Sequence, residues 1–111
     1  MCGIVGYSST LAYPISSQLL SAMNLKLKHR GPESSDIWID DDGVVGLAHS
    51  RLAIQDLSSA GAQPMISHCA RFIIVFNGEI YNHLLLRAKL DKINKTEWKS
   101  NSDTETLLSC F

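Results

Sequence analysis

The sequence has little of what disulfide-stapled, zinc-binding or membrane-spanning proteins require. Its 111 residues include only three cysteines, Cys2, Cys69 and Cys110, and no C-x-x-C pair. An odd number of cysteines without paired spacing predicts neither a disulfide framework nor a zinc site. The longest unbroken apolar run, residues 72–76, is far too short to cross a bilayer. We therefore expect no membrane association, and a reducing, cytoplasmic setting in which thiols stay free.

The sequence also lacks a block of positive charge. Ten Lys and Arg residues stand against eleven Asp and Glu, so the net charge is −1 and the pI is about 6.4. Lys26, Lys28 and Arg30 lie close together but have no stacking aromatic residues with them. Nucleic acid is therefore not an expected partner. With 45% apolar and 19% charged residues, the composition predicts one small globular domain with a core.

No metal site is predicted either. The acidic run at residues 40–42 has no further ligand at calcium-loop spacing, so a solvated turn is the better interpretation. The four histidines have no ligand spacing between them. We interpret His29 and His49, which fall inside the motifs described below, as structural hydrogen-bonding residues.

Apolar periodicity predicts strands with helices between them, which is typical of an α+β or a layered α/β domain. The run at 71–76 is apolar on both faces and predicts a central strand that ends in a tight turn at Asn77-Gly78. A capping box is expected at Ser102-Asp103-Thr104-Glu105. The other predicted strands are 2–8, a hairpin of 36–40 and 44–49 with Asp41-Asp42-Gly43 in its turn, and a short strand at Trp98; the predicted helices are 14–28, 82–92 with Asn82 as its cap, and one from 102 onward.

Cys2 is the first candidate catalytic residue. If Met1 is removed, the chain begins with a residue that carries both a thiol and an α-amine. The reference pKa of an α-amine is about 7.7–8.0, which suits a general base for the thiol proton. The simpler interpretation is a buried structural cysteine on a first strand, which Met-Cys-Gly alone favours.

Further polar residues stand at the ends of the predicted elements. They are the segment 29–33, Arg51 after a strand, Asn77-Gly78-Glu79 after the predicted central strand, and Asp103 at a helix start. Each has a structural alternative, as a strand-end charge, a turn or a cap. Together they supply a nucleophile, a guanidinium for a carboxylate, an amide donor for an oxyanion and an acid for an ammonium group. That set suits acyl transfer on an amino-acid substrate.

These motifs resemble a known family. The opening Met-Cys-Gly-Ile-Val-Gly and His-Arg-Gly-Pro-Glu at 29–33 resemble class II glutamine amidotransferases, the N-terminal-nucleophile type. The segments 47–54 (Leu-Ala-His-Ser-Arg-Leu-Ala-Ile), 61–65, 76–83 and 102–105 are similar to the asparagine synthetase branch, in the same order over the whole chain.

The resemblance implies that Cys2 attacks the side-chain amide of glutamine, forms a γ-glutamyl thioester and releases ammonia. The Asn77 side chain and the Gly78 N–H would form the oxyanion hole, Arg51 would bind the α-carboxylate, and Glu79 and Asp103 would bind the α-ammonium. Backbone groups from 52 to 55 would line the pocket. The implied catalytic residues are Cys2, Asn77 and Gly78, and the implied glutamine-binding residues are Arg51, Leu52, Ala53, Ile54, Gln55, Asn77, Gly78, Glu79 and Asp103.

The resemblance also implies an α+β fold, the layered αββα sandwich of N-terminal-nucleophile hydrolases. Residues 1–111 would be a partial domain truncated at its C-terminal end, with the ATP-dependent synthetase domain absent. No Ser-Gly-Gly-x-Asp-Ser loop for pyrophosphate occurs in the sequence. We expect no cofactor for the glutaminase step, and ATP and Mg only for the missing synthetase domain, which would accept the ammonia. A homodimer of the full-length protein stays open.

Three functions remain open at this point. The first is hydrolysis of glutamine to supply ammonia for asparagine synthesis from aspartate. The second is a truncated, catalytically inactive fragment. The third is the glutaminase part of an amidotransferase that acts on a sugar acceptor in polysaccharide biosynthesis.

Overall fold

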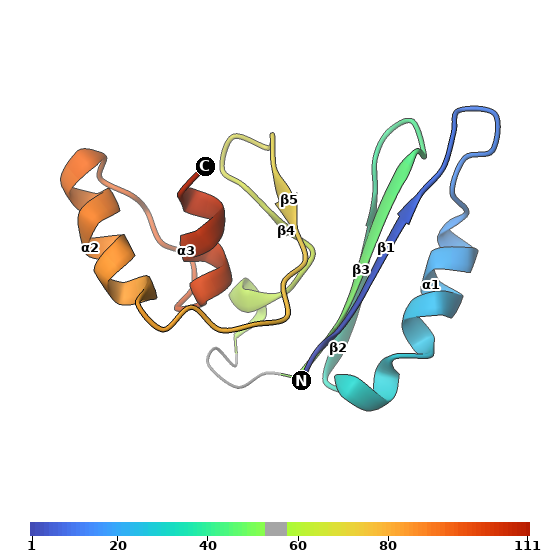
Figure 1. Cartoon of the computed structure of the whole chain (residues 1–111), viewed down its shortest axis with the longest axis horizontal. Helices are drawn as coiled ribbons and strands as arrows, with labels where there is room; N and C mark the ends of the chain where they lie inside the picture. The colour runs from blue at the N-terminus through green and yellow to red at the C-terminus, as the bar shows by residue number, and fades with distance from the viewer. Residues whose placement is uncertain (53–57) are drawn as a thin grey trace.

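The structure, a computed structural model, describes residues 1–52 and 58–111, which form an α+β arrangement (Figure 1). We call residues 1–52 the N-terminal half and residues 58–111 the C-terminal half. The N-terminal half contains an antiparallel sheet of β1 (Gly3–Ser8), β2 (Ser34–Ile39) and β3 (Val45–Arg51) in the order β1-β3-β2. The predicted first strand and the hairpin after it are confirmed.

The turn of that hairpin uses its acidic residues as backbone acceptors. One carboxylate oxygen of Asp40 accepts the N–H groups of Val44, at 2.7 Å, and Val45, at 2.8 Å. Gly43 has a positive φ of 67°, a conformation that glycine adopts without steric cost. The prediction of a turn at 40–43 is therefore confirmed, with a structural task for Asp40.

Helix α1 (Ser17–Leu25) is shorter than the predicted helix 14–28. It begins three residues later because the Ser16 side chain caps it, accepting the N–H of Leu19 at 3.2 Å. After Leu25 the chain tightens into the 3₁₀ turn η1 (Lys28–Arg30). The predicted boundaries were therefore wrong, although the apolar spacing identified the helix.

The apolar core lies between α1 and one face of the sheet. It consists of Val5, Ile15, Leu20 and Ala48, with Leu20 and Ala48 fully buried. One polar group crosses this core: the Asn24 amide donates to the Ser35 hydroxyl at 2.8 Å and accepts from the Ser50 hydroxyl at 2.9 Å. The helix is thus joined to the sheet by both apolar packing and specific hydrogen bonds.

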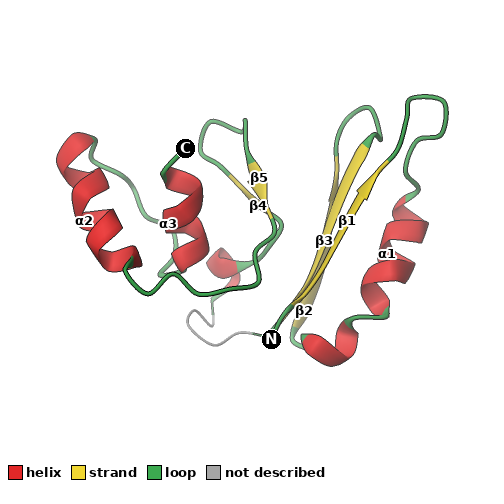
Figure 2. Ribbon diagram, in the orientation of Figure 1, coloured by secondary structure: helices red, strands yellow, loops and turns green. Residues whose placement is uncertain are grey.

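The C-terminal half lies on the opposite side of the sheet from α1 (Figure 2). It contains the turn η2 (Ser59–Gly61), a two-stranded antiparallel ribbon of β4 (Met65–Ile66) and β5 (Ile73–Ile74), and the helices α2 (His83–Ile93) and α3 (Asp103–Ser109). In Figure 1 the ribbon lies between the sheet and α3, and α2 lies outermost. No helix in the described ranges has the length and apolar character needed to cross a membrane.

The prediction of a central strand at 71–76 was wrong. Only Ile73 and Ile74 form a strand, and within the described part of the chain that strand pairs with β4 alone. Apolar residues on both faces indicate burial, but the number of strand neighbours depends on the partners that the tertiary structure supplies. The turn expected at Asn77-Gly78 does not reverse the chain either, because the segment bends there and continues to α2.

The caps of the last two helices differ from expectation in detail. Asn82 stands at the N-cap of α2, but its side chain makes no capping hydrogen bond there. Ser102 caps α3 and accepts the Thr104 N–H at 3.1 Å. Glu105 does not complete the capping box, because its carboxylate accepts N–H groups from Lys99 and Ser100 instead. The predicted strand at Trp98 is absent, and this residue lies in the segment between α2 and α3.

Candidate active site

A cavity of about 320 Å³ opens between the two halves, and residues from both line it. All seven predicted site residues that the structure describes are among them. Ala53, Ile54 and Gln55 lie outside the described residues. The seven are Cys2, Arg51, Leu52, Asn77, Gly78, Glu79 and Asp103.

Cys2 is half-buried directly before β1, and its thiol lies against the backbone of Leu52. The Leu52 N–H donates to Sγ at 3.4 Å, and the thiol faces the Leu52 carbonyl oxygen at 3.6 Å. The Arg30 Nε donates to the Cys2 carbonyl at 3.4 Å. The α-amine belongs to Met1, which is 73% exposed and also lines the cavity. Only after removal of Met1 would thiol and amine belong to one residue.

Arg51 reaches the cavity from the end of β3, the strand next to β1. Its Nη1 donates to the Ser58 carbonyl at 2.7 Å. The preceding motif at 29–33 packs directly on this strand end, since a Cβ at Gly31 would lie 2.3 Å from the Ser50 carbonyl oxygen. Glycine in that motif therefore allows the turn after α1 to lie against the strand that carries Arg51.

Asn77, Gly78 and Glu79 form the opposite wall and are exposed to solvent. Hydrogen bonds on both sides hold this segment. The Phe76 N–H donates to the Gln63 side-chain oxygen at 2.6 Å, and the Ile80 N–H donates to Oδ2 of Asp103 at 2.8 Å. The segment that would supply oxyanion donors is thus tied at each end.

Asp103 is the first residue of α3 and is only 5% exposed. A carboxylate at a helix N-terminus is stabilised by the helix dipole. The next residue, Thr104, accepts the Gln63 side-chain amide at 3.1 Å. Gln63 therefore bridges the wall that contains Asn77 to the helix that begins with Asp103. Sequence reasoning had placed Gln63 in a motif without assigning it this task.

His49 is a cavity residue that sequence reasoning misjudged. It is 1% exposed, and neither ring nitrogen makes a hydrogen bond with acceptable geometry to any residue in the described ranges. The expectation that it is a structural hydrogen-bonding residue was therefore wrong. Burial lowers the pKa of His49 below 6.5. A contact with the backbone of Phe76 raises this pKa in part, and the nearby Arg51 cation lowers it. The signal available in the sequence was its spacing of two from Arg51, which places both on one face of β3.

The cavity thus brings together a thiol, a guanidinium, an amide with adjacent backbone N–H groups, and two carboxylates. Charges of both signs at one cavity match the carboxylate and ammonium of a free amino acid, and the thiol supplies a nucleophile. Within the described residues, no group of three or more His, Cys, Asp or Glu side chains is placed to hold a metal ion.

Comparison with known proteins agrees with these observations. The family described as "Glutamine amidotransferase domain" matches residues 1–111. The chain belongs to this family. Its relatives include a "Probable asparagine synthetase [glutamine-hydrolyzing]" of Dictyostelium discoideum, 37% identical over 100% of this chain and 20% of that protein. "Asparagine synthetase B [glutamine-hydrolyzing]" of Escherichia coli is 36% identical over 100% of this chain and 19% of that protein.

A third relative has a different name. "Amidase chry2" of Gibberella zeae is 33% identical over 90% of this chain and 14% of that protein. The chain spans about a fifth or less of the length of these three curated relatives. Membership in the family therefore concerns the amidotransferase part, which the relatives carry beside much additional sequence.

Proposed function

We propose that this chain hydrolyses the side-chain amide of L-glutamine to glutamate and ammonia. The observation that carries the proposal is the convergence on one cavity of Cys2, Arg51, Asn77, Gly78 and Asp103, which come from widely separated parts of the chain. Family membership supports the same chemistry.

In the proposed reaction, Met1 has been removed and the α-amine of Cys2 takes the thiol proton. The sulfur attacks the amide carbon of glutamine, and the oxyanion accepts hydrogen bonds from the Asn77 side chain and the Gly78 N–H. One such donor is typically worth about 3–4 kcal/mol of barrier. The amine then returns the proton to the leaving nitrogen, and ammonia departs from a γ-glutamyl thioester. Water attacks the thioester and releases glutamate and the thiol.

The charged residues of the cavity would hold the other end of the substrate. Arg51 would bind the α-carboxylate in a bidentate manner, a geometry that a lysine cannot reproduce. Asp103 and Glu79 would bind the α-ammonium. Because these groups act on the amino-acid end, the proposal predicts a preference for free glutamine over amides that lack either charge.

For the acceptor we propose aspartate, with an ATP- and Mg-dependent synthetase domain receiving the ammonia. The Dictyostelium and E. coli relatives, which are named glutamine-hydrolysing asparagine synthetases, support this choice. A sugar acceptor stays the alternative, and one of the relatives has a name other than asparagine synthetase. The succession of α1, sheet, ribbon and α3 in Figure 1 supports the layered sandwich of N-terminal-nucleophile hydrolases as the complete fold.

The test is a glutaminase assay on the chain after Met1 removal. We expect Cys2→Ala to abolish glutamate release and Cys69→Ala, at an exposed cysteine, to leave it unchanged. A chain with an uncleaved N-terminal extension should be inactive, because Cys2 then has no free amine. Full activity of Cys2→Ala would refute the mechanism, and absence of glutaminase activity in the processed chain would refute the function.

A further inference from the structure

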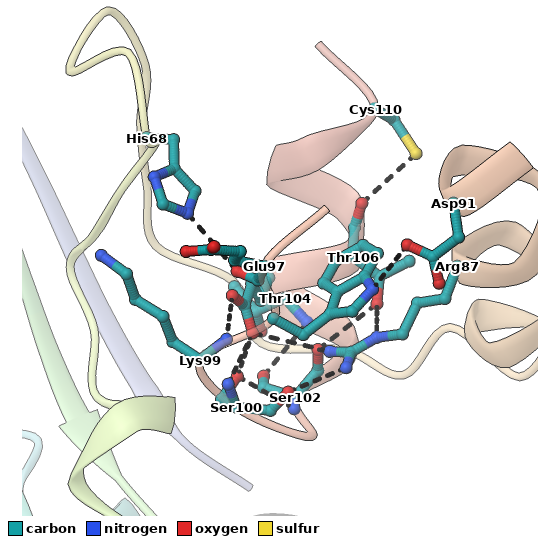
Figure 3. A network of polar contacts seen from close by, with 12 residues as sticks. His68, Arg87, Asp91, Glu97, Lys99, Ser100, Ser102, Thr104, Thr106 and Cys110 are labelled. Atoms are coloured by element: carbon teal, nitrogen blue, oxygen red, sulfur yellow. Dashed lines mark hydrogen bonds and ion pairs between the residues drawn. The ribbon is translucent and has the colours of Figure 1, made fainter. Parts of the chain in front are cut away.

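Arg87 is a buried cation on the inner side of α2, away from the cavity, and its guanidinium is bound to the start of α3 (Figure 3). Its Nη1 donates to the Ser100 carbonyl and its Nη2 to the Ser102 carbonyl, each at 2.8 Å. Its Nε donates to the Thr106 hydroxyl at 2.7 Å. One side chain thus holds the segment before α3 and the first turn of that helix together.

Neighbouring side chains enclose this guanidinium. The Trp98 ring covers it, with 4.2 Å between the Arg87 Cζ and the ring centroid, and the indole N–H donates to Asp91 at 3.0 Å. Glu105 lies 3.6 Å from Nη2 and also accepts two backbone N–H groups and the Ser100 hydroxyl, at 2.7–2.8 Å. Such a planar fork is fixed in both position and orientation.

The cavity residue Asp103 follows directly after the Ser102 carbonyl that Arg87 binds. We propose that Arg87 is a positioning residue that sets the Asp103 carboxylate for the α-ammonium of the substrate. Because Oδ2 of Asp103 already accepts the Ile80 N–H, the inference assigns Oδ1 to that ammonium. Arg87 itself does not line the cavity, so it acts through Asp103. This inference rests on the proposed glutaminase function and deepens it.

The planar guanidinium is essential to this arrangement. A lysine at position 87 would keep the positive charge beside Glu105, but its single ammonium cannot span the Ser100 carbonyl, the Ser102 carbonyl and the Thr106 hydroxyl in fixed directions. Arg87→Lys should therefore loosen the start of α3 while it leaves the ion pair available. The displaced group would be Asp103, whereas the thiol would stay against Leu52. The segment with the oxyanion donors would keep its other tie, the hydrogen bond from the Phe76 N–H to Gln63.

The experiment compares two substrates of the processed chain, L-glutamine and glutaramate, which is glutamine without its α-amino group. For Arg87→Lys we expect kcat/KM for glutamine to fall by about tenfold, mainly through KM, as for loss of a charge-assisted hydrogen bond. We expect kcat/KM for glutaramate to change by less than about twofold, because that substrate has no ammonium for Asp103 to bind. If Arg87 had a merely structural role, Arg87→Lys would lower kcat/KM for both substrates to a similar extent, and that result would overturn the inference.

Two further variants keep the test decisive. Thr106 is fully buried, and its hydroxyl accepts the hydrogen bond from the Arg87 Nε. Thr106→Val removes this acceptor with little change in side-chain size, whereas Thr106→Ser retains the hydroxyl. In the valine variant, kcat/KM should fall for glutamine more than for glutaramate, as in Arg87→Lys. The serine variant should behave as wild type. Lys89→Met, at an exposed site on α2, is the matched control for a lost cation.

Asp103→Asn separates failure of the inference from failure of the proposed function. If this variant lowers kcat/KM for glutamine but not for glutaramate, while Arg87→Lys and Thr106→Val do not, only the positioning role of Arg87 is wrong. If Asp103→Asn also fails to discriminate, the assignment of Asp103 to the ammonium is wrong and the inference falls with it. If the processed chain hydrolyses neither substrate, the proposed function is refuted. The role of Arg87 is then tested by binding to a Cys2→Ala chain with and without Arg87→Lys. Weaker binding of glutamine, with unchanged binding of glutaramate, supports the positioning role, and an equal change for both overturns it.

Discussion

The interior of each half of the molecule is built from a different balance of apolar and polar side chains. In the N-terminal half, α1 packs on the sheet through the apolar side chains of Val5, Ile15, Leu20 and Ala48. In the C-terminal half, Leu108 is the one buried apolar side chain among the residues that the structure describes. The other buried side chains there are polar or charged, namely Gln63, Arg87, Ser100, Ser102, Asp103, Thr104 and Thr106.

This difference has a physical consequence for the cavity between the halves. In the N-terminal half, non-directional apolar packing acts together with the hydrogen bonds of Asn24 to Ser35 and Ser50, so the wall with Cys2 and Arg51 does not rest on polar contacts alone. Hydrogen bonds are directional and cost free energy when a buried partner is lost. The wall with Asp103 therefore depends on single polar side chains, and above all on Arg87.

The largest effect on stability should come from breaking the polar network. Arg87→Met should lower the free energy of unfolding by about 3–5 kcal/mol, because it leaves the Glu105 carboxylate and two carbonyl groups without their buried partner. Chemical denaturation measures the loss, and hydrogen exchange should place it first in α2 and α3. Arg71→Met, at an exposed arginine, is the control and should cost less than about 1 kcal/mol. A loss of that small size for Arg87→Met would mean that the network does not hold this half.

A somewhat smaller effect should follow from opening the apolar core. Leu20 is 0% exposed, and Leu20→Ala should cost about 3 kcal/mol through lost burial and the cavity that remains. Leu19 is its neighbour on the same helix and is 47% exposed, so Leu19→Ala should cost less than about 1 kcal/mol. Hydrogen exchange should show the Leu20→Ala loss first in α1 and β1–β3. Equal acceleration throughout both halves would show that they unfold as one unit and would weaken the comparison.

The smallest effects should appear as two separate pH windows, one for each half. Since the pKa of His49 is lowered from 6.5 by burial, the unfolded chain binds a proton below pH 6.5 that the folded chain does not, and stability falls with decreasing pH from there. His49→Gln should remove this slope, as followed by thermal unfolding at a series of pH values. A slope that is unchanged in this variant would show that another group titrates.

Glu105 should act at lower pH. Burial raises its pKa, but hydrogen bonds from Lys99 and Ser100 and the Arg87 cation outweigh burial and hold the pKa below 4.5. Its contribution to stability is therefore complete above pH 4.5 and is lost as the pH falls through the lowered folded-state value. Glu105→Gln should flatten the stability curve in that lower window and leave the His49 window intact. Loss of both windows in one variant would indicate coupling between the halves.

The sequence predicted the elements of the N-terminal half better than those of the C-terminal half, because apolar patterns are visible in the sequence and directional polar contacts are not. Alternating and helical apolar patterns report burial against one partner, and β1, α1 and the β2–β3 hairpin are elements of that kind. The run at 71–76 has the strongest strand pattern in the chain, yet only Ile73 and Ile74 pair, because pairing depends on which strands lie nearby. Likewise Glu105 has capping-box spacing, but it accepts hydrogen bonds from Lys99 and Ser100 in a segment that Arg87 also binds.

The sequence predicted which residues form the candidate site, but not the contacts between them across the cavity. Local motifs identified Cys2, Arg51, Asn77, Gly78, Glu79 and Asp103 by chemistry and order, and the structure brings these residues to one cavity. The bridging role of Gln63 and the burial of the His49 ring could not be read from the chain. Both depend on what lies across the cavity, and no local pattern contains that information.

By itself, the sequence determined which side chains could react, the elements that build the N-terminal half, and the family to which the chain belongs. These follow from residue chemistry, short-range periodicity and the order of motifs, none of which needs the partners in space. Only the tertiary structure decided that the run at 71–76 contributes the two residues Ile73 and Ile74 to a ribbon, that His49 is buried at the cavity, and that Arg87 holds the helix beginning with Asp103. Those outcomes depend on directional contacts between segments far apart in the chain, for which the sequence alone carries no local signal.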